Sequence, residues 1–317
     1  MIHVAELTAD ALELGHAALN ALVPLVGEGQ CIALLIDPML RDPGVEDWAV
    51  GLGRRRLRVA NAAAEQSPYV VWVDIDTHEG ERALQASLMA GAAESLGLMD
   101  TDEHQVRSLA AWLVPSTRLD VGQRRQLVSM LSELSIWPNQ RDITFRFWDP
   151  RVASVLGDAL GGNAWRDVLA GLSLSQWCCF GSSKVFTCTE RSFASSSEPR
   201  WAVTPDISRR LQALSWRNRV WHLARAWATL DELELSGVSR LVERAMRYGL
   251  SHEDDVIRYA HCALTIHPEF DRHPVVAEFI RSLIAEPLDG SFDKFVRRWD
   301  EALAEELRAG RWMTNNG

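Results

Sequence analysis

The sequence predicts an α/β N-terminal lobe, in which a mixed sheet is flanked by helices, followed by an all-α C-terminal lobe. Two observations lead to this expectation. Short apolar runs with strand character alternate with helical patterns up to about residue 190. A polar, serine-rich stretch at residues 191–201 then interrupts the pattern, and every later segment has helical spacing. We therefore expect one domain over residues 1–203 and a second over residues 204–317.

The elements of the first lobe follow from apolar periodicity and from the residues that bound each run. Gly29 and Pro38 enclose CIALLI, which predicts a buried strand, and strict alternation in ITFRFW predicts another. In chain order we expect a helix over 9–22, strands over 31–36 and 69–75, a helix over 81–96, a strand over 108–115, a helix over 121–134, a strand over 143–148 and a hairpin over 176–190 that turns at Gly181.

The helical lobe begins at Thr204 and Pro205, an N-cap followed by proline at the first helical position. Glycine, proline and His-Pro breaks separate its helices. These are expected over residues 205–230, 237–248, 251–266, 274–285 and 291–308.

Composition limits the classes of function. The chain of 317 residues is 47% hydrophobic, which is enough to fill a sizeable core. Its formal net charge of −10 argues against a general nucleic-acid binder and against acidic membranes, because both ligands need a basic surface. No run approaches about 18 consecutive apolar residues, and the N-terminus has no signal-peptide pattern. We therefore expect a cytoplasmic protein that binds neither nucleic acid nor membrane.

Two residue types stand out in the composition. The five cysteines have neither the count of a disulfide framework nor paired metal-ligand spacing, so we expect buried thiols. Thirteen tryptophans against three tyrosines indicate extensive aromatic packing. Part of this surplus is expected on a partner-binding surface, where Trp is enriched.

The stretch FRFWDPRV (residues 145–152) ends an expected strand on Asp149, Pro150 and Arg151. Asp accepts hydrogen bonds from the free N–H groups at a helix start, Pro fits the next position, and Arg can pair with a nearby carboxylate. A catalytic Asp149 would need a base or metal partner, and the sequence offers neither. We therefore interpret this segment as a structural corner.

The stretch WVDIDTHEG (residues 72–80) is the strongest enzymatic motif. Asp74 and Asp76 leave one expected strand end, where two carboxylates could share a Mg²⁺ ion as in D-x-D phosphatases and glycosyltransferases. His78 stands where the phosphatase pattern has Thr or Val, and Lys184 and Lys294 are the only lysines. The alternative interpretation is a polar strand-to-helix loop.

Metal and cofactor signatures are incomplete elsewhere. The segment after Ser251 is not an H-E-x-x-H zinc helix, because Val256 stands three residues after Glu253, and His252 and His261 fall on different helix faces. GLSLSQW lacks the second glycine of a nucleophile elbow, and GLGRRR follows a helix-like stretch where a dinucleotide fingerprint needs a strand. We therefore expect no enzymatic activity, no metal and no cofactor.

The first helix of the second lobe has an unusual pattern. Its apolar stripe changes sides near Ser215, so one aromatic face has no obvious core assignment. Trp and Arg are preferred interface anchors, which predicts a partner-binding surface at Trp216, Arg217, Trp221 and Arg225. A packed helix with a solvated arginine face is the alternative.

Five segments together resemble the type VI secretion adaptor chaperones, the Tap or Tec proteins. They are ALLIDPMLRDP, PYVVWVDIDTHEGERALQASL, FRFWDPRVASVL, WCCFGSS and RAMRYGLSHEDDVIRYAHCALTIHPEFDRHP, in the order and approximate spacing of that family, over residues 30–285. Trp148 stands where Tyr is commoner in the family, and Pro38 where Gly or Ala often follows the Asp. The signature positions in this chain are Asp37, Phe145, Arg146, Asp149, Pro150, Arg151, Phe180, Gly181, Glu253 and Asp255.

The resemblance implies a non-enzymatic adaptor. Such a protein holds a cognate effector toxin in the cytosol and passes it to the spike protein of the type VI secretion system, without itself staying on the exported spike. Two alternatives remain open at this stage: a metal-dependent enzyme of the D-x-D type, and a scaffold for an unrelated protein.

Overall fold

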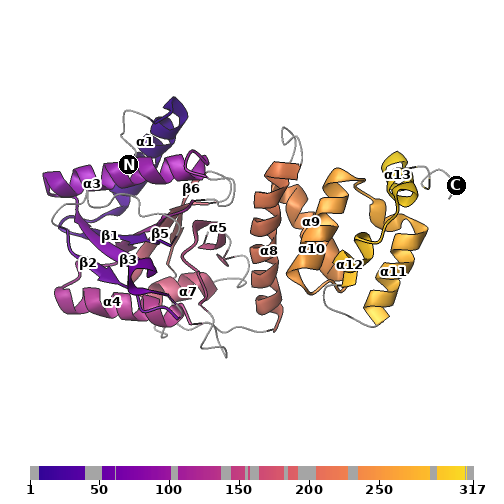
Figure 1. Ribbon diagram of the computed structural model, residues 1–317. Helices are drawn as coiled ribbons and strands as arrows, with labels where there is room; N and C mark the ends of the chain where they lie inside the picture. The colour runs from indigo at the N-terminus through magenta and orange to yellow at the C-terminus, as the bar shows by residue number, and fades with distance from the viewer. Residues whose placement is uncertain are drawn as a thin grey trace. The chain divides into compact units, whose positions relative to one another are not determined.

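The computed structural model describes residues 7–39, 52–60, 62–100, 106–136, 144–153, 156–157, 164–181, 185–191, 205–227, 235–285, 291–310 and 312. The chain divides into two compact units, Met1–Ile207 and Ser208–Gly317, whereas the sequence places the boundary at residue 203. The first unit holds a six-stranded sheet flanked by helices and the second is helical, which confirms the expected fold class (Figure 1).

The first unit contains both predicted and unexpected elements. The helices over 9–22 and 121–134, the strands over 31–36 and 109–115, and the hairpin near 176–190 were expected; β2, α7 and the 3-10 turns were not. Its elements are α1 (Ala9–Leu22), η2 (Val23–Leu25), β1 (Cys31–Ile36), β2 (Arg54–Arg56), η3 (Ala64–Gln66), β3 (Tyr69–Asp74), α3 (His78–Ser95), β4 (Leu109–Pro115), α4 (Val121–Leu134), α5 (Pro150–Ala153), α7 (Ala164–Gly171), β5 (Leu174–Phe180) and β6 (Phe186–Glu190).

The strand order is β2-β3-β1-β4-β5-β6, and every described pair is antiparallel. The expectation of a mixed sheet is therefore wrong. Helix α3 does connect two strands that run in the same direction, β3 and β4, as in a βαβ unit. The strand β1 lies between them, however, and pairs antiparallel with both.

Two helical layers enclose the sheet. Helices α1 and α3 cover one face, and α4 and α7 lie on the other (Figure 1). The first layer buries Leu22 and Leu88 against Ile32, Leu34 and Trp112. Because both faces are covered, the inner strands are apolar almost throughout: β4 is buried at every position and β1 at all but the first.

The segment expected as a strand over 143–148 is not one; residues 141–143 lie outside the described part, and the rest forms one bridge and a turn. Thr144 makes an isolated bridge with Ile136. Phe145, Phe147 and Trp148 are all buried, so burial does not alternate as a two-faced strand requires. Packing of both aromatic positions 147 and 148 turns the chain here.

The β5–β6 hairpin contains a correction to the expected thiols. Cys178 and Cys188 face each other across the two strands and form a disulfide, whereas Cys31, Cys179 and Cys262 are free. Ten residues separate the bonded pair, so the sequence spacing gave no C-x-x-C signal. The pairing arises from strand register.

The helical region is formed by α8 (Pro205–Trp227), α9 (Leu235–Arg247), α10 (Glu253–Thr265), η5 (Phe270–Arg272), α11 (Pro274–Ala285), α12 (Ser291–Val296) and α13 (Glu301–Ala309). Helix α8 is continuous, so the change of apolar face near Ser215 is not a break. The single helix expected over 291–308 is two helices, because the Asp300 side chain accepts from the Leu303 N–H and starts α13 anew.

Tyr259, Phe270 and Phe292 lie at the centre of the second unit's core. They pack with Val220 of α8 and Val242 of α9. Among the helices of the described residues, none combines the length and the apolar character needed to cross a membrane.

Gly91 determines how closely α3 approaches the sheet. A Cβ atom there would lie 2.5 Å from the Trp112 ring and 3.1 Å from Phe180. We expect Gly91→Ala to lower the free energy of unfolding by about 1 to 3 kcal/mol, because overpacking outweighs the usual helical gain of alanine. Urea unfolding measures this. Gly53→Ala is the control, since its Cβ would meet nothing within 4 Å, and an equal effect of both substitutions would refute the close-contact explanation.

Candidate functional site

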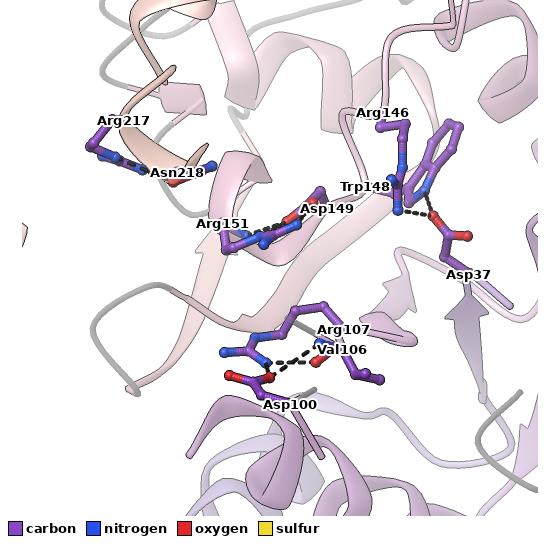
Figure 2. A network of polar contacts seen from close by, with 10 residues as sticks. All are labelled: Asp37, Asp100, Val106, Arg107, Arg146, Trp148, Asp149, Arg151, Arg217 and Asn218. Carbon is purple, nitrogen blue, oxygen red and sulfur yellow. Dashed lines mark hydrogen bonds and ion pairs between the residues drawn. The ribbon is translucent and has the colours of Figure 1, made fainter. Parts of the chain in front are cut away.

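Asp37, the residue that follows β1, joins two signature segments of the chain. Its Oδ2 accepts hydrogen bonds from the Trp148 indole N–H at 2.6 Å and from the Arg146 guanidinium at 2.7 Å (Figure 2). Its Oδ1 accepts from the Met39 N–H at 3.1 Å, and the side chain is 3% exposed. The carboxylate is therefore fully engaged in holding residues 109 and 111 positions further along the chain.

Asp149 and Arg151 form the second half of this corner. The Asp149 backbone carbonyl accepts from the N–H groups of Val152 and Ala153, which begins α5, with Pro150 at its first position. The Asp149 carboxylate accepts from the Arg151 backbone N–H at 3.0 Å and from its guanidinium Nε at 2.9 Å and Nη2 (Figure 2). One side chain thus caps a helix and binds an arginine in a bidentate pair.

The charges at the corner are strongly coupled. Burial by itself raises the pKa of Asp149, but the charge and hydrogen bonds of Arg151 and the charge of Arg146 outweigh it, so the pKa lies well below its usual range. Burial lowers the pKa of Arg151, and the Asp149 charge more than reverses this to a net increase. Arg107, which pairs with Asp100 at 3.1 Å, has a lowered pKa mainly because it is buried.

Aromatic rings pack around the corner. Phe147 lies 5.3 Å from Trp148 and 5.8 Å from Trp177, and Trp177 lies 5.2 Å from Trp165, measured between ring centroids. All four rings are at most 1% exposed. Phe145 is buried beside them, at 6.3 Å from Phe147. Much of the tryptophan surplus is therefore core.

The remaining signature of the first unit is also structural. Phe180 ends β5 and is 2% exposed, between Trp112 and Phe186. The Gly181 N–H donates to the Val185 carbonyl at 3.1 Å and so closes the hairpin.

In the second unit, Asp255 is buried and accepts a hydrogen bond from the Asp293 backbone N–H at 2.9 Å, which ties α10 to α12. Glu253 is exposed at the first position of α10, where an acid complements the helix dipole. The expected capping box at Ser251 is wrong, because His252 is the N-cap residue and its side chain makes no capping bond.

Sequence analysis missed one buried polar cluster of the helical unit. Asp271 Oδ2 accepts from the hydroxyls of Tyr248 and Tyr259 at 2.9 and 2.6 Å, and Arg244 lies 3.3 Å from it. Burial and Asp271 together raise the pKa of both tyrosines. No local pattern marks this cluster, because its members come from α9, the following turn, α10 and η5.

The Asp74 and Asp76 pair is used locally. Asp74 Oδ1 accepts from the Asp76 N–H, and the Asp74 carbonyl accepts from the Thr77 hydroxyl at 2.8 Å. Asp76 Oδ2 accepts from the Gly29 N–H at 3.2 Å. Over the residues that the structure describes, no three His, Cys, Asp or Glu side chains are grouped so as to hold a metal ion. The arrangement is that of a loop before a helix whose N-cap is Thr77.

The structure separates the four predicted anchors of α8. Trp216 is 5% exposed and belongs to the core of the helical unit, and Arg217 is 7% exposed with a 3.0 Å bond to the Asn218 side chain. Trp221 is half-buried and packs on the same core. The side chain of Arg225 lies outside the described part. Of the described anchors, Trp221 presents the most surface to a partner.

Comparison with protein-family models, with curated proteins and with solved structures found no match to this chain.

We expect Asp149→Asn to cost about 3 kcal/mol of unfolding free energy at pH 7, because it leaves the half-buried Arg151 guanidinium without its charge partner. The lowered pKa means that the carboxylate contributes stability that is present above its unfolded value near 4 and is lost as the pH falls. The difference between wild type and variant should therefore shrink below about pH 4.

Asp120→Asn is the matched control in the same urea titrations. Asp120 caps α4 through the Gln123 N–H at 2.8 Å but is exposed, and Asn caps a helix as well as Asp does. If Asp149→Asn and Asp120→Asn cost the same at pH 7, the Arg151 pair contributes nothing measurable.

Proposed function

We propose that the protein is an effector adaptor of a type VI secretion system. It binds a cognate toxin in the cytosol and loads it onto the spike protein. The proposal rests on the sequence resemblance, and one structural observation supports it. Asp37 from the first signature segment and Arg146 and Trp148 from the third form a single buried joint, as expected if the resembling segments specify a common framework.

The role proposed is non-enzymatic. The carboxylates of Asp37 and Asp149 are held by guanidinium and indole donors, which leaves them poorly suited to act as proton acceptors or metal ligands. Asp74 and Asp76 bind backbone N–H groups of their own loop and of Gly29. Function is then a property of surfaces, with partners that are proteins.

The proposed compartment is the cytosol. Cellular thiol systems there keep most cysteine pairs reduced, so the Cys178–Cys188 bond would be opened or protected by the hairpin. The proposal includes no nucleic-acid or membrane partner, in keeping with the net charge of −10.

The proposed effector contact is on α8 at Trp221 and Arg225. Trp216 and Arg217, which the sequence also nominated, are buried and act in folding, so they are not part of the contact now proposed. An aromatic side chain that packs one edge on the core and leaves part of its surface free is a typical interface anchor.

Co-expression with the toxin and spike proteins encoded beside its gene tests the function. We expect a complex of the protein with the toxin that elutes together in size-exclusion chromatography without the spike, and transfer of the toxin when the spike is added. A spike from an unrelated secretion cluster is the control. Absence of binding to both neighbours, or Mn²⁺-dependent thermal stabilisation that Asp74→Ala abolishes, would contradict the adaptor role.

Trp221→Leu tests the α8 contact, because leucine preserves an apolar contact with the core while removing the aromatic surface. We expect toxin affinity to fall about thirtyfold, with a melting temperature within a few degrees of wild type. Arg219→Ala, an exposed position on the same helix, should bind at full strength. Full-strength binding by Trp221→Leu would place the contact elsewhere.

A further inference from the structure

The first unit contains an arginine-lined cavity that the adaptor role does not use. Its volume is about 450 Å³, in the range of ligand-binding clefts. No lining residue is acidic. The lining consists of Arg54, Arg55, Arg56, Arg58, Arg125, Val128, Ser129 and Ser132.

Two elements form the walls of the cavity. Strand β2 supplies the arginine run, and α4 supplies positions 125, 128, 129 and 132, which lie on one helix face by their spacing. The Arg58 backbone N–H donates to the Ser132 hydroxyl at 3.0 Å, and Ser132 donates in turn to the Val128 carbonyl. This link fixes the chain after β2 against the helix, so the cavity has a defined shape.

The five guanidinium groups are not equivalent. Arg54 and Arg56 lie over the Tyr69 ring, each 5.4 Å from its centroid, and Arg56 also donates to the carbonyls of Glu65 and Ser67. Arg55, Arg58 and Arg125 are exposed. Among the described residues, no side chain or carbonyl pairs with these three guanidinium groups. Three unneutralised cations therefore converge in a chain whose net charge is −10.

The strand itself adds a second recognition element. β2 is the end strand of the sheet and pairs only with β3 among the described strands. The outer main-chain groups of an end strand can accept a further extended chain, with side-chain pockets giving specificity. Arginine matches a carboxylate in a bidentate manner, so an extended segment rich in Asp or Glu fits both features.

Edge protection and phosphate binding each account for less of the cavity. Charged residues on an edge strand block unwanted pairing, but that role does not require Arg125 on the facing helix or a cavity between them. A phosphate ligand is usually held by a helix N-terminus or a glycine-rich loop, and the α4 start at Val121 and Gly122 does not line the cavity. The single apolar lining residue, Val128, gives no platform for a base or another ring.

We propose that the cavity between β2 and α4 binds an acidic, extended segment of a partner protein. The segment adds to the free edge of β2, and its carboxylates pair with Arg55, Arg58 and Arg125. The identity of the partner as toxin or spike rests on the proposed adaptor function; the binding chemistry does not.

The test uses the full chain and a fluorescein-labelled peptide of six glutamates, followed by fluorescence anisotropy. We expect saturable 1:1 binding that weakens about tenfold in the double variant Arg55→Gln/Arg125→Gln and weakens as salt is raised. Arg82→Gln, an exposed arginine on α3, is the control and should bind like wild type. The matched peptide of six glutamines should bind at least tenfold more weakly than the glutamate peptide.

Three results would overturn the proposal. They are equal binding of the two peptides, unchanged binding by the double variant, and tighter binding of inorganic pyrophosphate than of the glutamate peptide, which would identify a phosphate site. The result is independent of the adaptor role. If the glutamate peptide binds as expected but the neighbouring toxin and spike do not, the proposed function fails and the acidic-segment site stands.

Discussion

The carboxylate of Asp37 is the contact on which the first unit depends. Every strand of the central sheet could form from local apolar pattern, but the corner after Thr144 has no strand partner to hold it beyond one isolated bridge among the described residues. Asp37 supplies the connection by accepting from Arg146 and Trp148, and the indole is at the same time part of the Trp177 cluster through Phe147. A buried charge is tolerated there because it is paired and fully hydrogen-bonded.

A similar device recurs in the helical unit. Asp271 draws two tyrosine hydroxyls and Arg244 together, and Asp255 binds the start of α12. In both units a buried acid holds segments that packing alone would leave free to shift. Such acids are specific because a displaced segment would leave a desolvated carboxylate unpaired, which costs several kcal/mol.

These buried charges separate framework from surface. Signature residues such as Asp37, Asp149 and Asp255 shape the fold, so a resemblance carried by them bears on architecture first and on partners only through it. The free chemistry lies elsewhere, at the partly exposed Trp221 and at Arg55, Arg58 and Arg125. An adaptor that uses exposed arginines in an otherwise acidic chain gains electrostatic attraction for acidic segments while repelling nucleic acid overall.

The sequence by itself determined most elements and the division into an α/β part and a helical part. Strands such as CIALLI and helices such as α4 follow from apolar periodicity and caps, which are local properties. Only the tertiary structure decided the antiparallel order, because β1 enters between β3 and β4, and it alone paired Cys178 with Cys188 by strand register. It also placed Trp216 in a core and Arg125 opposite β2. Burial and charge pairing arise between residues far apart in the chain, such as Asp37 and Trp148, and local spacing carries no information about such contacts.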